Sequence, residues 1–309
     1  MRGMKFSRRF PVVVLIAGLS FVSTTHAKNP AKSADPQRPP IVGVAWIALR
    51  TADMAATRKF YTGYLGLEEQ AGVKDGGLTR VLFKVNDRQY IQVLPELKDP
   101  NQNRLIEIAF ETANAEQLRA YMASQDVKVP EKVQNMGLNT KGFAITDTED
   151  HLVKFVQFTK IHNSKESKPD NRVSTHMIHT GFIVNDRAGA DHLFKDILGF
   201  TETWHGGMTD DKISWVDMRV PEGKDWLEYM LNYSNSDVRI SGIMNHLALG
   251  VPSVEEGYQT VVKRGLNPEN PKIGRDGKWQ LNLYGPDLTR VELMEPKPVQ
   301  TPCCSPMLQ

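Results

Sequence analysis

Four side chains that commonly bind divalent metals recur in the second half of the sequence: His179, Glu228, His246 and Glu292, at intervals of 49, 18 and 46 residues. Because the intervals are long, no two of them share a helix turn, and each falls in a stretch typical of a β-strand. Two imidazoles and two carboxylates form a donor set that suits Zn, Fe(II), Mn, Co or Ni rather than a thiolate-seeking metal. The pattern predicts one divalent metal ion and does not choose among these metals.

The neighbours of these residues agree with a strand that places the ligands on an open face. Side chains alternate across a strand, so a ligand shares its face with residues two positions away. Around His246, the apolar Leu247 and Leu249 would be buried on the opposite face, and the small Ala248 leaves room on the ligand side. A single His or Glu on a strand is more often structural or exposed, so the hypothesis depends on all four residues together.

The elements that would hold the four ligands repeat along the chain. Residues 45–67 combine a strand pattern, a helical pattern and a Leu-Gly-Leu turn, and residues 179–200 repeat this order with Leu-Gly-Phe. Weaker copies begin at Glu107 and His246, and each copy ends in β-rich sequence. We therefore expect an α+β fold of tandem βαβββ modules.

The ends of the chain and one internal stretch differ from the repeats. Residues 1–27 combine a basic start, an apolar run too short to span a bilayer and a Thr-His-Ala site, which together indicate an export signal. We expect a disordered segment over 28–40, a first domain over 41–159, a polar linker over 160–175, a metal-binding domain over 176–296 and a tail over 297–309.

Composition narrows the functional classes. The chain has 38 basic and 36 acidic residues, and loss of the leader removes four basic residues and no acidic one. The mature chain is thus near neutral, which argues against a nucleic-acid partner or a membrane-surface partner. An exported chain would be periplasmic or secreted, by either the general or the twin-arginine route. Cys303 and Cys304 are adjacent in the tail, where unpaired thiols are favoured over an intermolecular bridge.

The repeats carry a resemblance to a known superfamily. Together with the Leu-Gly turns, the strand His-Leu-Ala-Leu-Gly-Val at 246–251 and the segment Gly-Pro-Asp-Leu-Thr-Arg-Val-Glu-Leu at 285–293 occur in the order and spacing of the vicinal oxygen chelate superfamily. This superfamily includes glyoxalase I, extradiol ring-cleavage dioxygenases and bleomycin-resistance proteins. The resemblance covers about residues 41–296 and implies two domains of paired modules, each with a curved mixed sheet around a cleft.

The first half departs from the metal-binding pattern. At the four positions that correspond to the ligands it has Trp46 (or Ala45), Gln92, Glu107 and Lys154. A lysine and a tryptophan leave at most two usable ligands there, one of them an amide. We therefore expect the first domain to be a scaffold without a metal ion.

The resemblance implies chemistry on a small molecule with two neighbouring oxygens. A His/Glu/His/Glu set resembles glyoxalase I, in which the metal stabilises an enediolate. Glu292 would then be the catalytic base, and His179, Glu228 and His246 would hold the ion. Lyase or isomerase chemistry of this kind is the first hypothesis. An extradiol-type Fe(II) dioxygenase that uses His179, His246 and Glu292 is the second, although Glu228 lies near the place where those enzymes have a catalytic His.

Two further alternatives remain open from the sequence. A binding or resistance protein without catalysis would use the same cleft. A homodimer is compatible with the spacings, because swapped modules would preserve every interval between the ligands.

Overall fold

The computed structural model describes Met1, Gly3 and residues 36–75, 78–160, 171–233 and 238–308. All that follows concerns the unit Asp35–Gln309. The expected export signal, residues 28–35 of the expected N-terminal segment and residues 161–170 of the expected linker lie outside the described residues. Of the segment 28–40, residues 36–40 are described, and Arg38 there forms an ion pair with Glu222.

The first half of the described chain forms one mixed sheet of eight strands in the order β2-β3-β4-β1-β5-β8-β7-β6. The two central strands β1 and β5 are antiparallel, and each runs parallel to the last strand of its own module. The bounds are β1 Ile41–Arg50, β2 Glu68–Asp75, β3 Leu78–Lys84, β4 Tyr90–Leu94, β5 Leu105–Thr112, β6 Gln134–Gly137, β7 Thr140–Thr146 and β8 Leu152–Phe158.

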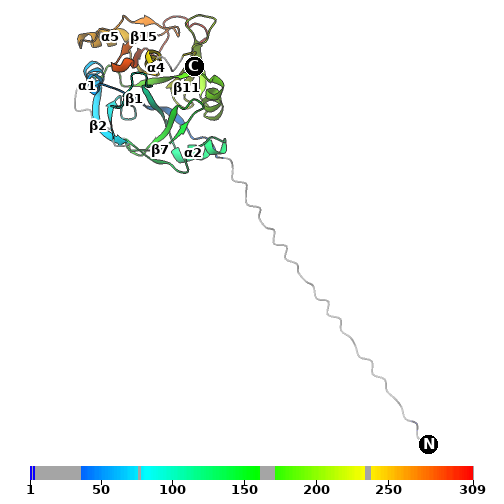
Figure 1. Ribbon diagram of the computed structural model, residues 1–309. Helices are drawn as coiled ribbons and strands as arrows, with labels where there is room; N and C mark the ends of the chain where they lie inside the picture. Colours follow the sequence, from blue (N-terminus) through cyan, green and yellow to red (C-terminus); the bar gives the residue numbers. More distant parts are fainter. Residues whose placement is uncertain (2, 4–35, 76–77, 161–170, 234–237, 309) are drawn as a thin grey trace. The chain divides into compact units, whose positions relative to one another are not determined.

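The second half repeats this plan in the order β10-β11-β12-β9-β13-β16-β15-β14. Figure 1 labels β1, β2 and β7 in the first sheet and β11 and β15 in the second. The bounds are β9 Met177–Val184, β10 Thr201–Gly206, β11 Trp215–Arg219, β12 Trp226–Leu231, β13 His246–Gly250, β14 Lys272–Ile273, β15 Trp279–Tyr284 and β16 Arg290–Met294. The predicted α+β class with tandem βαβββ modules is confirmed.

Each module carries its helix after the first strand, as the sequence predicts. α2 (Ala115–Ser124) is capped by the side chain of Asn114, and α5 (Val254–Lys263) by that of Ser253. In the other two modules a short α-helix continues into a π-helical segment: α1 (Met54–Arg58) into η1 (Lys59–Tyr64), and α3 (Arg187–Ala190) into η2 (Asp191–Ile197). Helix α4 (Val238–Met244) and the 3-10 turn η3 (Pro286–Leu288) were not expected from the sequence. No helix in the described ranges is both long enough and apolar enough to cross a bilayer.

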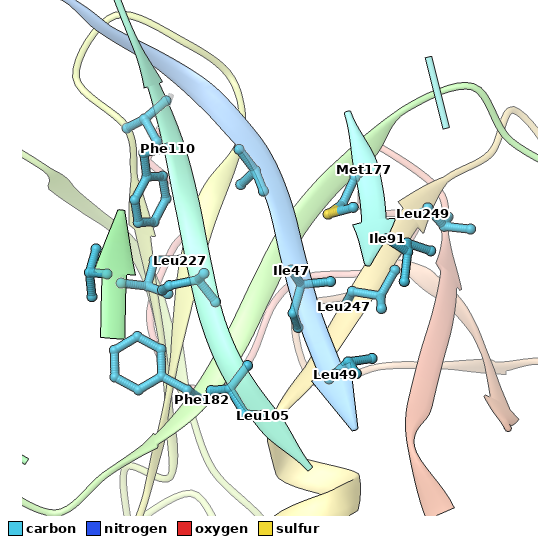
Figure 2. Packing of buried hydrophobic residues seen from close by; sticks show 14 of the residues in the cluster. Ile47, Leu49, Ile91, Leu105, Phe110, Met177, Phe182, Leu227, Leu247 and Leu249 are labelled. Atoms are coloured by element: carbon cyan, nitrogen blue, oxygen red, sulfur yellow. The ribbon is translucent and has the colours of Figure 1, made fainter. Parts of the chain in front are cut away.

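One hydrophobic core contains side chains from both sheets. Figure 2 shows Ile47 and Leu49 of β1 beside Leu247 of β13, and Leu105 of β5 near Phe182 of β9. All five side chains are buried. The two central strands of each sheet thus pack against those of the other, and the shared core fixes the second sheet, which carries the four predicted ligands.

The C-terminal tail corrects one expectation from the sequence. Cys303 and Cys304 are joined to each other by a disulfide within the chain. The prediction of two unpaired thiols was therefore wrong, because adjacent cysteines can bond to each other without a distant partner.

Candidate metal centre

The four predicted ligands lie on the four central strands of the second sheet, one on each of β12, β9, β13 and β16. In the strand register, Gly181 is opposite both Glu228 and His246, and Ala248 is opposite both His179 and Glu292. Residues with little or no side chain therefore lie between the ligands. The alternation expected around His246 is present, since Leu247 and Leu249 belong to the hydrophobic core.

The ligand atoms of the four residues converge within one chain. His179 Nε2 lies 3.0 Å from His246 Nε2, and Glu228 Oε2 lies 3.0 Å from His246 Nε2. Glu292 Oε2 lies 3.5 Å from His179 Nε2 and 3.9 Å from His246 Nε2. Ligand atoms of His179, Glu228 and His246 all lie within 4.8 Å of one another, close enough to share one ion, and Glu292 is not part of this three-residue group. All four residues that the sequence singled out are therefore brought together.

The backbone hydrogen bond of His246 sets the tautomer in which its Nε2 can act as a ligand. His246 Nδ1 lies 2.8 Å from the carbonyl oxygen of Met244, so Nδ1 carries the proton and Nε2 presents a lone pair. His179 Nδ1 is buried and has no hydrogen-bond partner in the described part of the chain. Burial lowers the pKa of both imidazoles, that of His246 to about 4. Both histidines are therefore neutral at physiological pH, as metal ligation requires.

The carboxylates are buried beside a cation and beside other acids. Glu292 Oε1 forms an ion pair with Arg290 Nη1 at 2.9 Å, and Oε2 lies 3.5 Å from His179 Nε2. Burial raises the pKa of Glu228 to about 7. Burial likewise raises the pKa of Asp217, the cross-strand neighbour of Glu228, well above its usual range. The convergence of lone-pair atoms with buried carboxylates fits a divalent cation, whose charge would offset the cost of burying these acids together.

Small residues make the arrangement possible. A Cβ atom added to Gly181 would lie 2.2 Å from Cε1 of His246. Any other residue at this position would displace the imidazole. Ala248 is fully buried opposite His179 and Glu292, where its single methyl group leaves space for both side chains.

A cavity of about 420 Å³ opens beside the four ligands. Its wall combines aromatic and sulfur-containing residues with charged ones: Trp204, Met208, Trp215, Trp226, Met230, Met294, Lys272, Arg275, Asp276, Arg290 and Asp217. Trp204, Trp215 and Trp226 line the cavity, and Trp279 does not. A cleft of this size suits a small molecule.

Sequence reasoning missed one charged residue of this wall, Asp217, and one buried residue that contacts the wall, Lys278. Asp217 shares a face of β11 with Trp215, and the pattern of alternating apolar residues Val216 and Met218 would have revealed it. Lys278 was also missed: its ammonium lies 3.2 Å from Asp276 and 4.8 Å from the ring centroid of Trp226. Lys278 follows a turn, where a lysine is usually exposed, so the sequence held no signal for its burial.

The first sheet places the corresponding residues in the same register. Ala48 is opposite Gln92 and Glu107, and Ala109 is opposite Trp46 and Lys154. Position 46 is therefore the one that corresponds to His179, rather than position 45.

The first-half positions are joined by direct contacts between side chains. Lys154 Nζ lies 2.7 Å from Glu107 Oε2, and Trp46 Nε1 donates to Glu107 Oε1 at 2.9 Å. Arg80 Nη1 lies 3.0 Å from the same oxygen. Side-chain cations thus neutralise the buried carboxylate in this half.

Comparison with known proteins gives one family match and several similar structures. Residues 43–155 match the Glyoxalase/Bleomycin resistance protein/Dioxygenase superfamily. A search of curated protein sequences finds no match. The matched residues lie in the half of the chain that lacks the histidines.

The solved structures cover both halves. The Mn(II)-bound glyoxalase from Novosphingobium aromaticivorans is 15% identical with a TM-score of 0.64, over 83% of this chain and 83% of that one. The 2,3-dioxygenase LapB from Pseudomonas sp. KL28 is 13% identical with a TM-score of 0.68, over 88% of this chain and 98% of that one. Homoprotocatechuate 2,3-dioxygenase from Brevibacterium fuscum, in a complex with 3,4-dihydroxyphenylacetate, is 15% identical with a TM-score of 0.61, over 88% of this chain and 86% of that one. The resemblance predicted from the sequence is confirmed, by sequence in the first half and by fold in both.

Proposed function

We propose, for a chain with the vicinal oxygen chelate fold in both halves, that the second half is a metal-dependent enzyme site for a small substrate with two neighbouring oxygens. The ligands would be His179, Glu228, His246 and Glu292, and Mn(II) is a candidate because a similar fold binds it in the Novosphingobium glyoxalase. When bound, the cation would act as a Lewis acid toward negative charge that develops on the substrate oxygens. The observation that carries the proposal is that His179, Glu228 and His246 bring their ligand atoms together beside the cavity and that Glu292 Oε2 lies 3.5 Å from His179 Nε2.

Lyase or isomerase chemistry is our first choice because of Glu228. Its carboxylate lies 3.0 Å from His246 Nε2, so the site has two imidazoles and two carboxylates rather than the two-His, one-Glu set associated with extradiol enzymes. Such chemistry moves a proton between neighbouring carbons, and a carboxylate beside the substrate can accept it and return it. Glu292 is the proposed base: Arg290 holds its Oε1, and Oε2 faces the imidazoles.

The alternative is an extradiol-type dioxygenase that uses Fe(II). The layout of two tandem halves supports it, since the fold spans 98% of the LapB dioxygenase chain. His179, His246 and Glu292 would be the ligands. Glu228 would then occupy the place of a proton-transferring group, and a pKa of about 7 suits proton transfer at neutral pH.

One set of measurements tests the metal site and separates these reactions. Elemental analysis of the purified protein should find about one metal ion per chain in the wild type. In His246→Ala, the affinity for the metal ion should fall at least as much as the roughly 10- to 100-fold loss that follows removal of a residue that supports a metal ligand. The exposed His192, which is 70% accessible, provides the control variant His192→Ala. Equal metal content in wild type and His246→Ala would end the proposal.

Oxygen uptake then separates the two reactions. The protein loaded with Mn(II) or Fe(II) is given 2-oxoaldehyde thiol adducts or catechols in an oxygen electrode. Turnover without oxygen uptake supports the lyase or isomerase, and uptake with catechols and Fe(II) supports the dioxygenase. In either case Glu292→Gln should lower the turnover rate by about 100-fold or more. A bound metal without turnover of either substrate class would favour a binding protein.

A further inference from the structure

The C-terminal tail joins the two edges of the second sheet. β10 and β14 are the edge strands of that sheet. We call residues 299–308 the strap. At one end, the amides of Val299 and Gln300 donate to the carbonyl oxygen of Gly277 at 2.8 and 3.3 Å, in the turn between β14 and β15. At the other end, Leu308 N donates to Thr203 O of β10 at 2.7 Å.

The middle of the strap contacts residues that line the cavity beside the metal centre. Cys303 N donates to Arg275 O at 2.8 Å, and Trp204 Nε1 donates to Cys303 O at 2.8 Å. Both Arg275 and Trp204 line the cavity. The Cys303 peptide unit therefore holds one residue from each edge of the sheet in place.

The chain also provides close approaches that only glycine permits. A Cβ atom on Gly206 would lie 2.4 Å from the indole of Trp204, and one on Gly277 would lie 2.3 Å from the carbonyl oxygen of Gln300. Gly277 in addition has φ +79°, a conformation that favours glycine. The backbone is thus shaped on both sides to receive the strap and the tryptophan it holds.

Little apolar burial supports the strap. Val299 and Leu308 are 54% and 56% exposed, so hydrogen bonds hold the strap to the sheet, and the Cys303–Cys304 disulfide restricts the strap's own backbone. Arg275 Nη2 donates to Cys303 Sγ at 2.8 Å and forms an ion pair with Asp210. Cys304 is exposed, so a reductant in solvent can reach the disulfide. A segment held in this way belongs to the least stable part of a fold.

We propose that the strap is a redox-sensitive latch on the wall of the cavity. The disulfide closes a small ring that includes the peptide bond between Cys303 and Cys304 and restricts the backbone that binds Trp204 and Arg275. A dithiol reductant would supply two electrons and two protons, the S–S bond would break, and two thiols and an oxidised reductant would result. The freed backbone would release Trp204 and Arg275. The strap would then detach more often from the edge strands β10 and β14.

Hydrogen exchange of the full mature chain tests the latch without a metal ion. The protein is kept in a chelator, with or without dithiothreitol, and exchange is followed by mass spectrometry. On reduction, peptides with Cys303 and Leu308 should exchange about tenfold faster or more, whereas peptides from β9 and β13 should be unchanged. Acrylamide quenching of tryptophan fluorescence should rise on reduction, and Trp204→Phe should remove most of that rise.

Two variants keep the test informative. The double variant Cys303→Ser and Cys304→Ser should exchange fast with and without reductant. Ser305→Ala, which removes the bonds of Ser305 with the backbone of His205 at 2.9 and 3.0 Å, should loosen the strap but keep the response to reductant. Two free thiols in protein isolated under oxidising conditions, or equal exchange with and without reductant, would overturn the proposal. Because no metal is present, these results are independent of the metal-site proposal.

Discussion

At the scale of single residues, Gly181 has the most direct influence on the metal centre. It carries no ligand atom, yet it lies opposite Glu228 and His246 in the register of the sheet. The imidazole of His246 occupies the space that a side chain at position 181 would need. The site thus depends on a missing methyl group as much as on the four donors.

Gly181→Ala should displace the His246 ring and weaken metal binding by about tenfold or more, comparable to the loss of a supporting residue. Gly63→Ala is the matched control, because the nearest atom to its added Cβ would be Lys59 Cγ at an ordinary 3.7 Å. Isothermal titration with Mn(II), together with circular dichroism to verify the fold, measures both. Unchanged affinity in Gly181→Ala would show that His246 is not a ligand.

The contact of His176 with Asp225 should make the stability of the fold depend on pH. His176 Nε2 lies 2.7 Å from Asp225 Oδ1, and this hydrogen bond raises the pKa of His176 above its usual 6.5. The protonated histidine therefore stabilises the folded state below about pH 6.5, and this contribution is lost as pH rises through the higher folded-state pKa. Nearby Lys224 opposes the effect, and the His176 side chain is 47% exposed.

The size of the pH effect should be that of a surface ion pair. In urea unfolding, the free energy of unfolding of wild type relative to that of His176→Gln should fall by less than about 1 kcal/mol between about pH 5.5 and pH 8. His192→Gln, at a 70% exposed position, is the control. A stability gain of wild type over His176→Gln on raising the pH would contradict the assigned sign.

At the scale of elements, the same four central strands carry different charge patterns in the two halves. In the second sheet, neutral imidazoles and carboxylates leave a place for an external cation. In the first sheet, Lys154 and Arg80 supply the positive charge, and each forms an ion pair with Glu107. The Glu107 side chain is completely inaccessible to solvent. The first half therefore uses a fixed internal pair where the second could use a metal.

Glu107→Gln should consequently destabilise the fold by about 3 kcal/mol or more, because it leaves two largely buried cations without their carboxylate. Glu69→Gln, which removes an ion pair with the 48% exposed Arg58, should cost less than about 1 kcal/mol. Denaturant unfolding compares the two variants. Metal content should stay at the wild-type level in both, and a loss of metal in Glu107→Gln would indicate coupling between the halves.

At the scale of the whole molecule, both sheets contribute to one hydrophobic core. Separate unfolding of either half would expose the face it shares with the other, where Phe182 and Leu247 are fully buried. A cooperative transition is expected when such a face cannot be exposed alone. The described chain from residue 36 onward should therefore behave as a single unit in unfolding.

Calorimetry should show one unfolding transition for the mature chain. A metal ion that binds only the folded state adds about 2.7 kcal/mol of stability at a concentration 100 times its Kd. Mn(II) should therefore raise the midpoint temperature of the single transition, and EDTA should reverse this shift. His246→Ala should lose the shift. Two transitions, of which only one responds to Mn(II), would show that the halves unfold independently.

The sequence by itself was enough to predict the repeats, the strands and the four candidate ligand positions. Period-two alternation marks which face a strand residue occupies, and matching patterns around residues 45, 107, 179 and 246 identify the modules. Helix caps such as Asn114 and Ser253 are local as well, because a cap bonds to an amide three residues away. These features depend on neighbours along the chain, so no tertiary contact was needed to predict them.

Only the tertiary structure decided which distant groups meet. Asp217 lines the cavity and Lys278 contacts the lining residues Asp276 and Trp226 because segments far apart in sequence come together in the second sheet. The two sheets share a core because their central strands pack together. The tail shows the same limit: its composition favours an exposed segment, yet backbone bonds to Gly277, Arg275 and Thr203 hold it to the sheet. Every residue type can form backbone hydrogen bonds, except that proline has no N–H to donate. The side chains of the tail therefore carry no signal for where its backbone binds.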